Sequence, residues 1–512
     1  MEKEFKFEFA TDDDSGLRDL PTLLDLKIGA PTEQALESEY FDTPDFLLRQ
    51  HGAALRVRRA GDHLVQTLKS GGEPGGAMFE REEYETAVDA PKPDLHALRA
   101  IVPKSSPLSR LLKDAERADQ LAPIFRTTVT RKTWALQLPG GDDLELALDR
   151  GKVSAADHDS AFSELELELK HGDPHCLNEV ALRLMDRIPL RLSMQSKSDR
   201  GYDMLMREKR SATTAAPVEL KKRDTVKTAF CKVMHNCLDQ VHANAPLVAA
   251  GNSPEGIHQM RVGLRRFRSA LDLFTEVATL PEGLEDEVKW IANALGEARD
   301  WHVLANATLA QVNAGDDHRD AMQETEAAAR SIEAARQADA ANAVKSPRYA
   351  HMMLALEQWL WSAPWGDTDD PARRKLLDAP AVDHAGRVLA KRHRKLVRRA
   401  NGLHKLDAPH RHRARIAAKK LRYATEFFAD LFRPATLKPY RRVLAKLQDD
   451  LGWGNDMAVA DGLLNHLELH HRKAAAGAGY ARGFLAARVA DDRSNQKALW
   501  KRFRATGRPQ SR

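Results

Sequence analysis

The sequence predicts an α+β protein of several domains, in which an N-terminal antiparallel β-barrel with added helices precedes a C-terminal all-α, duplicated helical bundle. Three observations support this prediction. Charged residues occupy every second position of several short segments in the first two hundred residues, apolar residues then recur every three or four positions, and two motifs are repeated in the second half. A chain of 512 residues is long enough for roughly two to four domains.

The first strand shows the alternation most clearly. Residues 2–9 read EKEFKFEF. Because successive side chains of a strand point to opposite faces, one face is charged and the other carries three phenylalanines. Such a segment alone is typical of an amphipathic strand with a solvated face. The pattern recurs with both signs of charge, so a closed set of strands could turn the charged faces inward together.

Further alternating segments follow along the chain. They are residues 53–59 (AALRVRR), 63–69 (HLVQTLK), 78–88 (MFEREEYETAV), 126–138, 144–153 and 162–170 (FSELELELK). Glycines and a proline at 71–76 predict a flexible loop, and the sequence PGG at 139–141 predicts the turn of a hairpin. Helices are expected at 92–120 and 175–187.

The apolar spacing changes after the stretch SATTAAP at residues 211–217, which is typical of a linker. The following residues are rich in Ala, Leu, Arg and Lys and have helical spacing. The predicted divisions are 1–208 for the barrel domain, 209–218 for the linker and 219–505 for the helical domain, with two repeats at about 219–345 and 346–505.

Two motifs in the helical part occur twice. Residues 258–268 (HQMRVGLRRFR) match residues 412–422 (HRARIAAKKLR), and residues 295–300 (LGEARD) match residues 451–456 (LGWGND). The two offsets are 154 and 156 residues. Two motifs in the same order at nearly the same spacing indicate duplicated helical bundles.

The composition restricts the partners and the compartment. The net charge of +5 combines 30 Lys and Arg against 39 Asp and Glu in residues 1–210 with 49 against 35 in the remainder, so the second half should attract polyanions. No apolar run is long enough for a membrane span, and the charges from position 2 onward differ from a secretory signal. Three cysteines without a C-x-x-C pair fit a reducing compartment, so we expect a cytoplasmic protein without a membrane partner.

The alternating charged positions suggest a phosphate chemistry for the barrel lumen. These positions are Glu2, Glu4, Lys6, Arg56, Arg58, Lys69, Arg81, Glu83, Glu85, Arg131, Glu145, Glu164, Glu166, Glu168 and Lys197. Lys and Arg side chains can bind phosphoryl oxygens, Arg with a bidentate fork. Carboxylates would repel the same anion unless a divalent cation such as Mg²⁺ or Mn²⁺ lay between them. Both signs in one closed space therefore predict a metal-bound, phosphate-rich ligand.

Several motifs in this region occur in the order of a known family. They are ExExK at 2–6, YFDT at 40–43, LRVR at 55–58, TLK at 67–69, REEYE at 81–85, ELELELK at 164–170 and SKS at 196–198. With these motifs, about residues 1–205 resemble the CYTH domains, also called triphosphate tunnel metalloenzymes. The resemblance implies an eight-stranded antiparallel tunnel and metal-dependent hydrolysis of a triphosphate.

The resemblance also implies roles for individual residues. The triphosphate would be bound by Lys6, Arg56, Arg58, Lys69, Arg81, Arg131 and Lys197. The metal or the attacking water would be held by Glu2, Glu4, Glu164, Glu166 and Glu168. The residues expected to carry catalysis are Glu2, Glu4, Lys6, Arg56, Arg58 and Lys69, and further lumen candidates are Glu83, Glu85, Glu145 and Asp149. Because Arg126 and Arg131 are five residues apart, a regular strand cannot turn both inward, and Arg131 is favoured.

The repeated motif of the helical half places basic residues on one helix face, from His258 to Arg268 in one copy and from His412 to Arg422 in the other. A solvated basic face is the usual outcome, but the duplication behind a leading histidine favours an anion groove. About residues 219–500 resemble the CHAD domain, which is associated with polyphosphate binding. The residues implied are His258, Arg261, Arg265, Arg266, Arg268, His412, Arg415, Lys419, Lys420 and Arg422. Nucleic acid is not the expected partner because no stacking aromatics are interleaved with these residues.

The sequence therefore predicts a cytoplasmic, Mg²⁺- or Mn²⁺-dependent inorganic triphosphatase that hydrolyses triphosphate to diphosphate and phosphate, with a helical domain that binds polyphosphate. One alternative keeps the tunnel but changes the activity to a thiamine or nucleoside triphosphatase or an adenylate cyclase. Another is a polyphosphate-binding or tethering protein with little turnover. No base- or thiamine-recognition motif is visible, which favours the smallest ligand.

Overall fold

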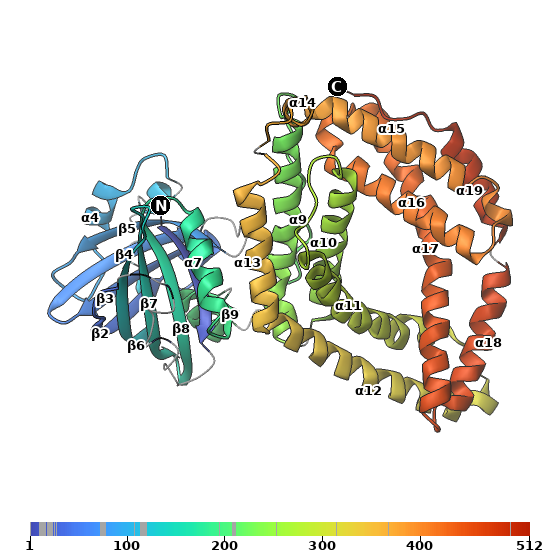
Figure 1. Cartoon of the computed structure of the whole chain (residues 1–512). Coiled ribbons are helices and arrows are strands. Elements are labelled where there is room, and N and C mark those ends of the chain that lie inside the picture. Colours follow the sequence, from blue (N-terminus) through green and yellow to red (C-terminus); the bar gives the residue numbers. More distant parts are fainter. Residues whose placement is uncertain are drawn as a thin grey trace. The chain divides into compact units, whose positions relative to one another are not determined.

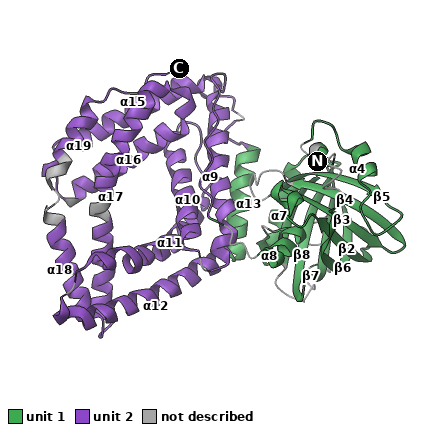
Figure 2. Ribbon diagram, turned by 180° about the vertical axis from the view of Figure 1, so that it is seen from behind, with its two compact units in different colours: residues 1–211, 345–362 green, residues 212–344, 363–512 purple. Residues whose placement is uncertain are grey.

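The structure, a computed structural model, describes most of the chain (Figure 1). The described residues are 2–9, 17, 24, 26, 28–71, 78–106, 108–112, 120–193, 195–206, 211–251, 253–313, 315–366, 368–491 and 493–511. The chain divides into two compact units (Figure 2). One comprises residues 1–211 and 345–362, and the other comprises residues 212–344 and 363–512.

Eight antiparallel strands close into a barrel in the first unit (Figure 1). They are β1 (Glu2–Phe9), β2 (Thr32–Asp42), β3 (Ala53–Ala60), β4 (His63–Gly71), β5 (Phe79–Ala87), β6 (Ala122–Gln137), β7 (Asp143–Ala155) and β8 (His158–His171). The order around the barrel is β5-β4-β3-β2-β6-β7-β8-β1, and pairing of β1 with β5 closes it. A short strand, β9 (Leu190–Leu192), pairs with the second half of β1. The predicted eight-stranded antiparallel barrel is confirmed.

Helices accompany the barrel in the same unit. They are α3 (Leu47–Gln50), α4 (Leu95–Ile101), α5 (Leu108–Leu111), α7 (His175–Met185), α8 (Lys197–Leu205) and α13 (Pro347–Ser362). The helical structure expected at 92–120 is confined, in the described part of that segment, to the short helices α4 and α5. The first of them stops because Val102 precedes Pro103, and a residue before proline is forced out of the helical conformation.

The two faces of β1 have opposite surroundings. Phe5 and Phe7 point out of the barrel and are fully buried in an apolar cluster with α7 and α13. Glu4 and Lys6, on the alternate positions, point into the barrel and line its cavity. The strand therefore carries core packing on one face and the charged site on the other, as the alternation predicted.

Helix α13 comes from the middle of the second half of the chain but packs in the core of the barrel unit. Ala350 and Leu354 lie in the same cluster as Leu177 and Leu184 of α7. The buried Asn178 side chain donates to the carbonyl oxygen of Leu354 at 3.0 Å. The sequence assigned this segment to the second helical repeat, because helical spacing alone does not reveal which unit a helix joins.

The second unit is helical, and its larger helices form two similar sets. They are α9 (Val226–Ala249), α10 (Pro254–Leu273), α11 (Leu284–Val303), α12 (Arg319–Val344), α14 (Pro371–Asp378), α15 (Ala381–Arg399), α16 (Ala408–Phe427), α17 (Pro434–His470), α18 (Ala475–Asp491) and α19 (Arg493–Ala505). The repeated motifs lie on α10 and α16 and on α11 and α17. At the start of each set, Val226 N donates to Ala379 O and Ala381 N donates to Asp224 O, both at 2.9 Å. These reciprocal bonds join equivalent positions of the two repeats.

Within the described residues, no helix combines the length and the apolar character needed to cross a bilayer.

We predict that Leu354→Ala destabilises the barrel unit, although Leu354 is more than one hundred residues from the barrel in sequence. Loss of this fully buried side chain should leave a cavity beneath α7 and cost about 2–5 kcal/mol. Hydrogen exchange of the full chain should then accelerate in α7 and β1. Leu238→Ala in α9 is the matched control, since Leu238 is similarly buried but lies in the other unit. Equal exchange in α7 and β1 for both variants would contradict the assignment of α13 to the barrel core.

Candidate active site in the barrel and a basic cluster in the helical unit

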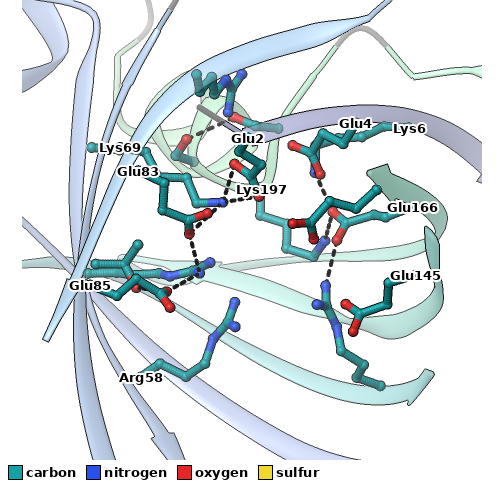
Figure 3. Close-up of a pocket in the computed structure, with 18 of the residues that line it drawn as sticks. Glu2, Glu4, Lys6, Arg58, Lys69, Glu83, Glu85, Glu145, Glu166 and Lys197 are labelled. Atoms are coloured by element: carbon teal, nitrogen blue, oxygen red, sulfur yellow. Dashed lines mark hydrogen bonds and ion pairs between the residues drawn. The ribbon is translucent and has the colours of Figure 1, made fainter. Parts of the chain in front are cut away.

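The barrel encloses a charged cavity of about 220 Å³ (Figure 3). The residues lining it are Glu2, Glu4, Lys6, Tyr40, Ala54, Arg56, Arg58, Thr67, Lys69, Arg81, Glu83, Glu85, Arg131, Glu145, Glu166, Glu168, Lys170, Ser196, Lys197 and Ser198. All seven cations predicted to bind a triphosphate are among them. The cavity also holds the predicted carboxylates except Glu164 and Asp149, which are fully buried.

One end of the barrel interior is apolar. Beyond the charged positions, the inward faces carry Phe125, Val153 and Phe162, which pack with Tyr202 of α8. Helix α8 can approach closely because position 201 is glycine. A Cβ at Gly201 would lie 2.3 Å from the Phe125 ring, a distance that no side chain tolerates. The apolar end thus fixes α8, and with it the side chains that α8 sends into the cavity.

The start of α8 is held by hydrogen bonds. Ser196 caps the helix in a reciprocal capping box with Asp199. At the other end, the Tyr202 hydroxyl donates to Asp42 at 2.7 Å, and Asp42 also accepts from the backbone of Leu48 at 2.8 Å. The aspartate of the YFDT motif therefore has a structural role, joining α3 to α8. Lys197, the first residue of α8, is positioned by this frame.

A buried network of ion pairs surrounds Glu166 (Figure 3). Lys197 Nζ lies 2.8 Å from both Glu166 and Asp149. Arg131 donates to Asp149 at 2.6 Å and to Glu166 at 2.5 Å, and Lys6 also pairs with Glu166. Burial opposes ionisation of Glu166, yet the neighbouring charges of Lys197 and Lys6 hold its pKa well below its usual range. These groups are therefore charged and mutually neutralised.

The opposite wall carries several cations, of which Lys69 pairs with Glu2 at 2.7 Å and with Glu83 at 2.9 Å. Arg56 lies 3.9 Å from each of Glu83 and Glu85, and Arg58 makes no ion pair within the described residues. Burial and the charges of Arg56 and Arg131 lower the pKa of Arg58 to about 10. Burial opposes ionisation of Tyr40, but the charges of Arg56 and Arg58 lower its pKa. A buried cation without a counter-ion, such as Arg58, favours the entry of an anion.

A third part of the cavity has carboxylates side by side. Glu4 on β1 lies opposite Glu168 on β8, which in turn lies opposite Glu145 on β7. Burial raises the pKa of Glu168, and the charges of Glu2 and Glu4 add to the shift while Lys170 opposes it. Glu4 Oε1 is buried without a hydrogen-bond partner. Like charges directly opposite one another are unfavourable unless a cation joins them.

These carboxylates fit a hard divalent cation, because oxygen ligands and an unpartnered carboxylate oxygen suit Mg²⁺ or Mn²⁺. Within the described residues, no three acidic, histidine or cysteine side chains are already arranged as metal ligands. In the present arrangement Lys170 occupies the position of a counter-ion, 2.8 Å from Glu168. A metal held by Glu2, Glu4 and Glu168 would therefore replace ammonium contacts in this part of the cavity.

The helical unit gathers a second group of charges, which we call the basic cluster: Arg261 and Arg265 of α10 with Arg415 and Lys419 of α16. Burial, followed by the charges of the three arginines, lowers the pKa of Lys419 to about 7. Each repeat adds one acidic residue, with Asp300 of α11 3.4 Å from Arg261 and Asp456 of α17 3.7 Å from Arg415. The second repeated motif thus supplies the counter-ions of the first.

Comparison with known proteins finds a known domain family in each half of the chain. Residues 1–202 match the CYTH domain, and residues 232–465 match the CHAD domain. The chain carries a CYTH domain followed by a CHAD domain.

Individual relatives match parts of the chain. An inorganic triphosphatase of Haemophilus influenzae is 30% identical over 168 residues, which are 33% of this chain and 45% of the relative. An uncharacterized protein of Mycobacterium tuberculosis is 28% identical over 306 residues, 56% of this chain and 55% of the relative. The chain therefore aligns with about half the length of these relatives. The chain is also similar to the crystal structure of the CHAD domain from the plant Ricinus communis, with 35% sequence identity and a TM-score of 0.54. The match covers 59% of this chain and 99% of the Ricinus communis chain.

In the CYTH domain, the structure separates residues that the sequence grouped together. Glu164 is fully buried behind the cavity, where it accepts from Lys197 at 3.0 Å and from Arg200 at 2.9 Å. Arg131 points into the cavity, whereas Arg126 is exposed. Lys170 lines the cavity but was not a predicted site residue, although its position two residues after Glu168 continues the same alternation.

In the CHAD domain, not all predicted basic residues join the basic cluster. Arg266 is only 2% exposed and donates to Glu426 at 2.9 Å and to Gln240 at 3.0 Å, so it holds helices together. Lys420 pairs with Asp272 at 3.0 Å. The other predicted residues lie around the cluster: His258 is half-buried, Arg268 and His412 are exposed, and the Arg422 guanidinium lies over the Tyr423 ring.

The two cavity arginines should differ in their effect on stability. Arg131→Ala would leave Asp149 and Glu166 buried with fewer cations, at a cost of about 3–5 kcal/mol. Arg58→Ala removes a cation without a counter-ion and should leave thermal stability unchanged or slightly higher, because it relieves repulsion. Thermal unfolding of both variants measures the contrast. An Arg58→Ala variant as destabilised as Arg131→Ala would show that Arg58 is a structural residue.

Proposed function

We propose that the CYTH domain is a divalent-metal-dependent inorganic triphosphatase, which hydrolyses triphosphate to diphosphate and phosphate. The observation that carries this proposal is the division of one closed cavity into a wall of cations, in which Arg58 has no counter-ion within the described residues, and a wall of adjacent carboxylates. A triphosphate would neutralise the first wall, and Mg²⁺ or Mn²⁺ would join the second wall to the same ligand. The inorganic triphosphatase among the relatives supports this choice.

The proposed substrate is inorganic because the cavity offers little for an organic group. Among the described lining residues, Tyr40 is the only aromatic one, and its ring is stacked on Phe125 with 4.5 Å between the centroids. No flat apolar face is thus available for a nucleobase or a thiamine ring. The size of about 220 Å³ also suits a small, fully charged ligand.

The roles of the residues follow from their positions. We assign binding of the phosphoryl oxygens to Arg56, Arg58, Lys69 and Arg81 on one side and to Lys6, Arg131 and Lys197 on the other. Preorganised cations of this kind stabilise the charge that develops on the transferring phosphoryl group. Bound Mg²⁺ or Mn²⁺ would supply further neutralisation of that charge. We assign its ligands to Glu2, Glu4 and Glu168, with Glu166 within reach and Glu164 acting through Lys197.

The hydrolytic step needs a water molecule in line with the bond that breaks. Its oxygen attacks the terminal phosphorus, the bond to the bridging oxygen breaks, and diphosphate leaves. A carboxylate of the acidic wall would orient the water and accept its proton.

We further propose that the CHAD domain binds polyphosphate through the basic cluster, flanked by His258, Arg268, His412, Lys420 and Arg422. Convergence of cations from two repeats on one site supports this proposal, because a chain of phosphates can contact both repeats at once. Arg266 would act indirectly, through the packing of α10 and α16.

Phosphate release from inorganic triphosphate should require Mg²⁺ or Mn²⁺ and should stop in excess chelator. Arg58→Ala should lower kcat/KM by about 10²–10³-fold while the protein stays folded, since it removes a cation from the phosphoryl site. Glu4→Gln should raise the metal concentration needed for half-maximal rate. The matched controls are Arg59→Ala on β3 and Glu39→Gln on β2, because both side chains are exposed and do not line the cavity. Full activity of Arg58→Ala, or in chelator, would refute the proposal.

Polyphosphate binding should weaken as the pH rises above about 7. In the protein without a ligand, Lys419 has a pKa of about 7. A bound polyanion favours the charged form of Lys419 and so raises that pKa. Binding therefore takes up a proton only above pH 7, and the affinity levels off below it. Calorimetry in buffers of different ionisation enthalpy measures this uptake.

Lys419→Arg should bind polyphosphate without the proton uptake, because arginine stays charged throughout. Lys391→Arg, at an exposed position of α15, should behave like the unchanged protein. Equal proton uptake by both variants would exclude Lys419 as the titrating group.

A further inference from the structure

A second cavity lies in the helical unit, beside the basic cluster. It has a volume of about 510 Å³ and is formed by α10, the start of α11 and α16. Its apolar wall includes Leu271, Val288 and Ile416, and its basic side includes Arg265 and Lys419. The barrel cavity is charged throughout, whereas this cavity combines an apolar wall with cations. It therefore suits a small ligand with an apolar body and an anionic group.

Lys419 is the reactive group of this cavity. Its side chain is half-buried and makes no hydrogen bond or ion pair within the described residues. The adjacent Lys420, by contrast, pairs with Asp272 at 3.0 Å. The groups that face Lys419 are Arg261 and Arg265 from α10, Arg415 from its own helix and, as the opposing charge, Asp456 from α17.

These surroundings leave much of Lys419 uncharged near neutral pH, since burial and the arginines lower its pKa to about 7. An uncharged amine has a free lone pair, which makes it a nucleophile toward carbonyl carbon. An ordinary lysine, with a pKa near 10.4, is almost wholly protonated under the same conditions. Lys419 thus has both the chemical form and the access that a covalent reaction needs.

Anion binding would place a reactant beside this amine. Arg265 Nε donates to the Tyr423 hydroxyl at 2.8 Å, which fixes the guanidinium at the cavity. No other hydrogen bond or ion pair of Arg265 occurs in the described part of the chain, so its terminal nitrogens can receive a phosphate. Arg268 lines the same cavity and is exposed.

We propose that Lys419 is a covalent modification site, at which its amine forms an imine with a small aldehyde that carries a phosphate monoester. The Nζ lone pair attacks the aldehyde carbon, and the carbonyl oxygen leaves as water with two protons from the amine. The reaction needs no oxidant or reductant. The phosphate would bind at Arg265 and Arg268, and the apolar wall would hold the body of the aldehyde.

The proposal is independent of triphosphate hydrolysis and predicts a consequence for the helical unit. An imine on Lys419 removes the ammonium hydrogens that would contact a polyanion and fills the cavity beside the basic cluster. Modification should therefore weaken any polyphosphate binding by the same cluster.

The test uses the full-length protein with pyridoxal 5′-phosphate as the probe, at limiting concentration and slightly alkaline pH. Borohydride reduction and peptide mass spectrometry then locate the modified lysines. Lys419 should react at least about tenfold faster than Lys420 or Lys391, given the difference in uncharged amine. The labelling rate of Lys419 should rise with pH and reach a plateau above about pH 7, whereas the labelling rate of an ordinary lysine would still be increasing there. Labelling of Lys419 no faster than that of the two other lysines would overturn the proposal.

Two controls separate the amine from the phosphate site. Lys419→Arg should abolish the fast labelling, and Lys391→Arg, at an exposed position of α15, should retain it, with circular dichroism confirming that both fold. Pyridoxal, which lacks the phosphate and its contacts with the arginines, should label Lys419 at least about tenfold more slowly. Inorganic phosphate should slow labelling by pyridoxal 5′-phosphate, because it occupies the same arginines. Equal labelling by pyridoxal and its phosphate would overturn the phosphate part of the proposal. These readouts involve neither hydrolysis nor polyphosphate.

Discussion

The barrel depends on the buried ion network centred on Glu166. This carboxylate of β8 accepts from Lys6 of β1, Arg131 of β6 and Lys197 of α8, and so links three strands and a helix that are distant in sequence. Removing charges from water is costly, and the cost is recovered only when every partner is in place. The network therefore fixes the geometry of the cavity, and it can do so only because the barrel is closed.

The same network explains why other charges of the cavity are free to act. It neutralises Lys6, Lys197 and Arg131 among the carboxylates around them, whereas Arg58 keeps its charge without a counter-ion and Glu4 keeps a carboxylate oxygen without a donor. A fold optimised for stability alone would pair or remove such groups. Their position on opposite walls is what a metal-bound polyanion would complement.

The helical unit reaches a similar state by duplication. Each repeat carries basic residues on one helix, and packing of α10 with α16 brings the two sets face to face. Burial and the like charges of the arginines then lower the pKa of Lys419. Helix α13, by contrast, does not pack in the helical unit to which its place in the sequence assigned it. Its apolar residues share a core with α7 and with Phe5 and Phe7 of β1, the strand whose inner face carries Glu4 and Lys6.

The sequence by itself determined the alternating charged strands of the first half, the helical second half and its duplication, because a two-residue period, a helical period and repeated motifs are local properties of the chain. Closure of the strands into a barrel is not a local property, and its prediction depended on the resemblance to the CYTH domains. The sequence also named every charged side chain that lines the barrel cavity except Lys170. Only the tertiary structure decided that Glu164 lies behind Lys197, that Arg266 is buried among polar partners, that α13 joins the barrel and that Lys419 meets two arginines of α10. Each of these depends on which distant segments pack together, and periodicity gives the face on which a side chain lies but not what it meets there.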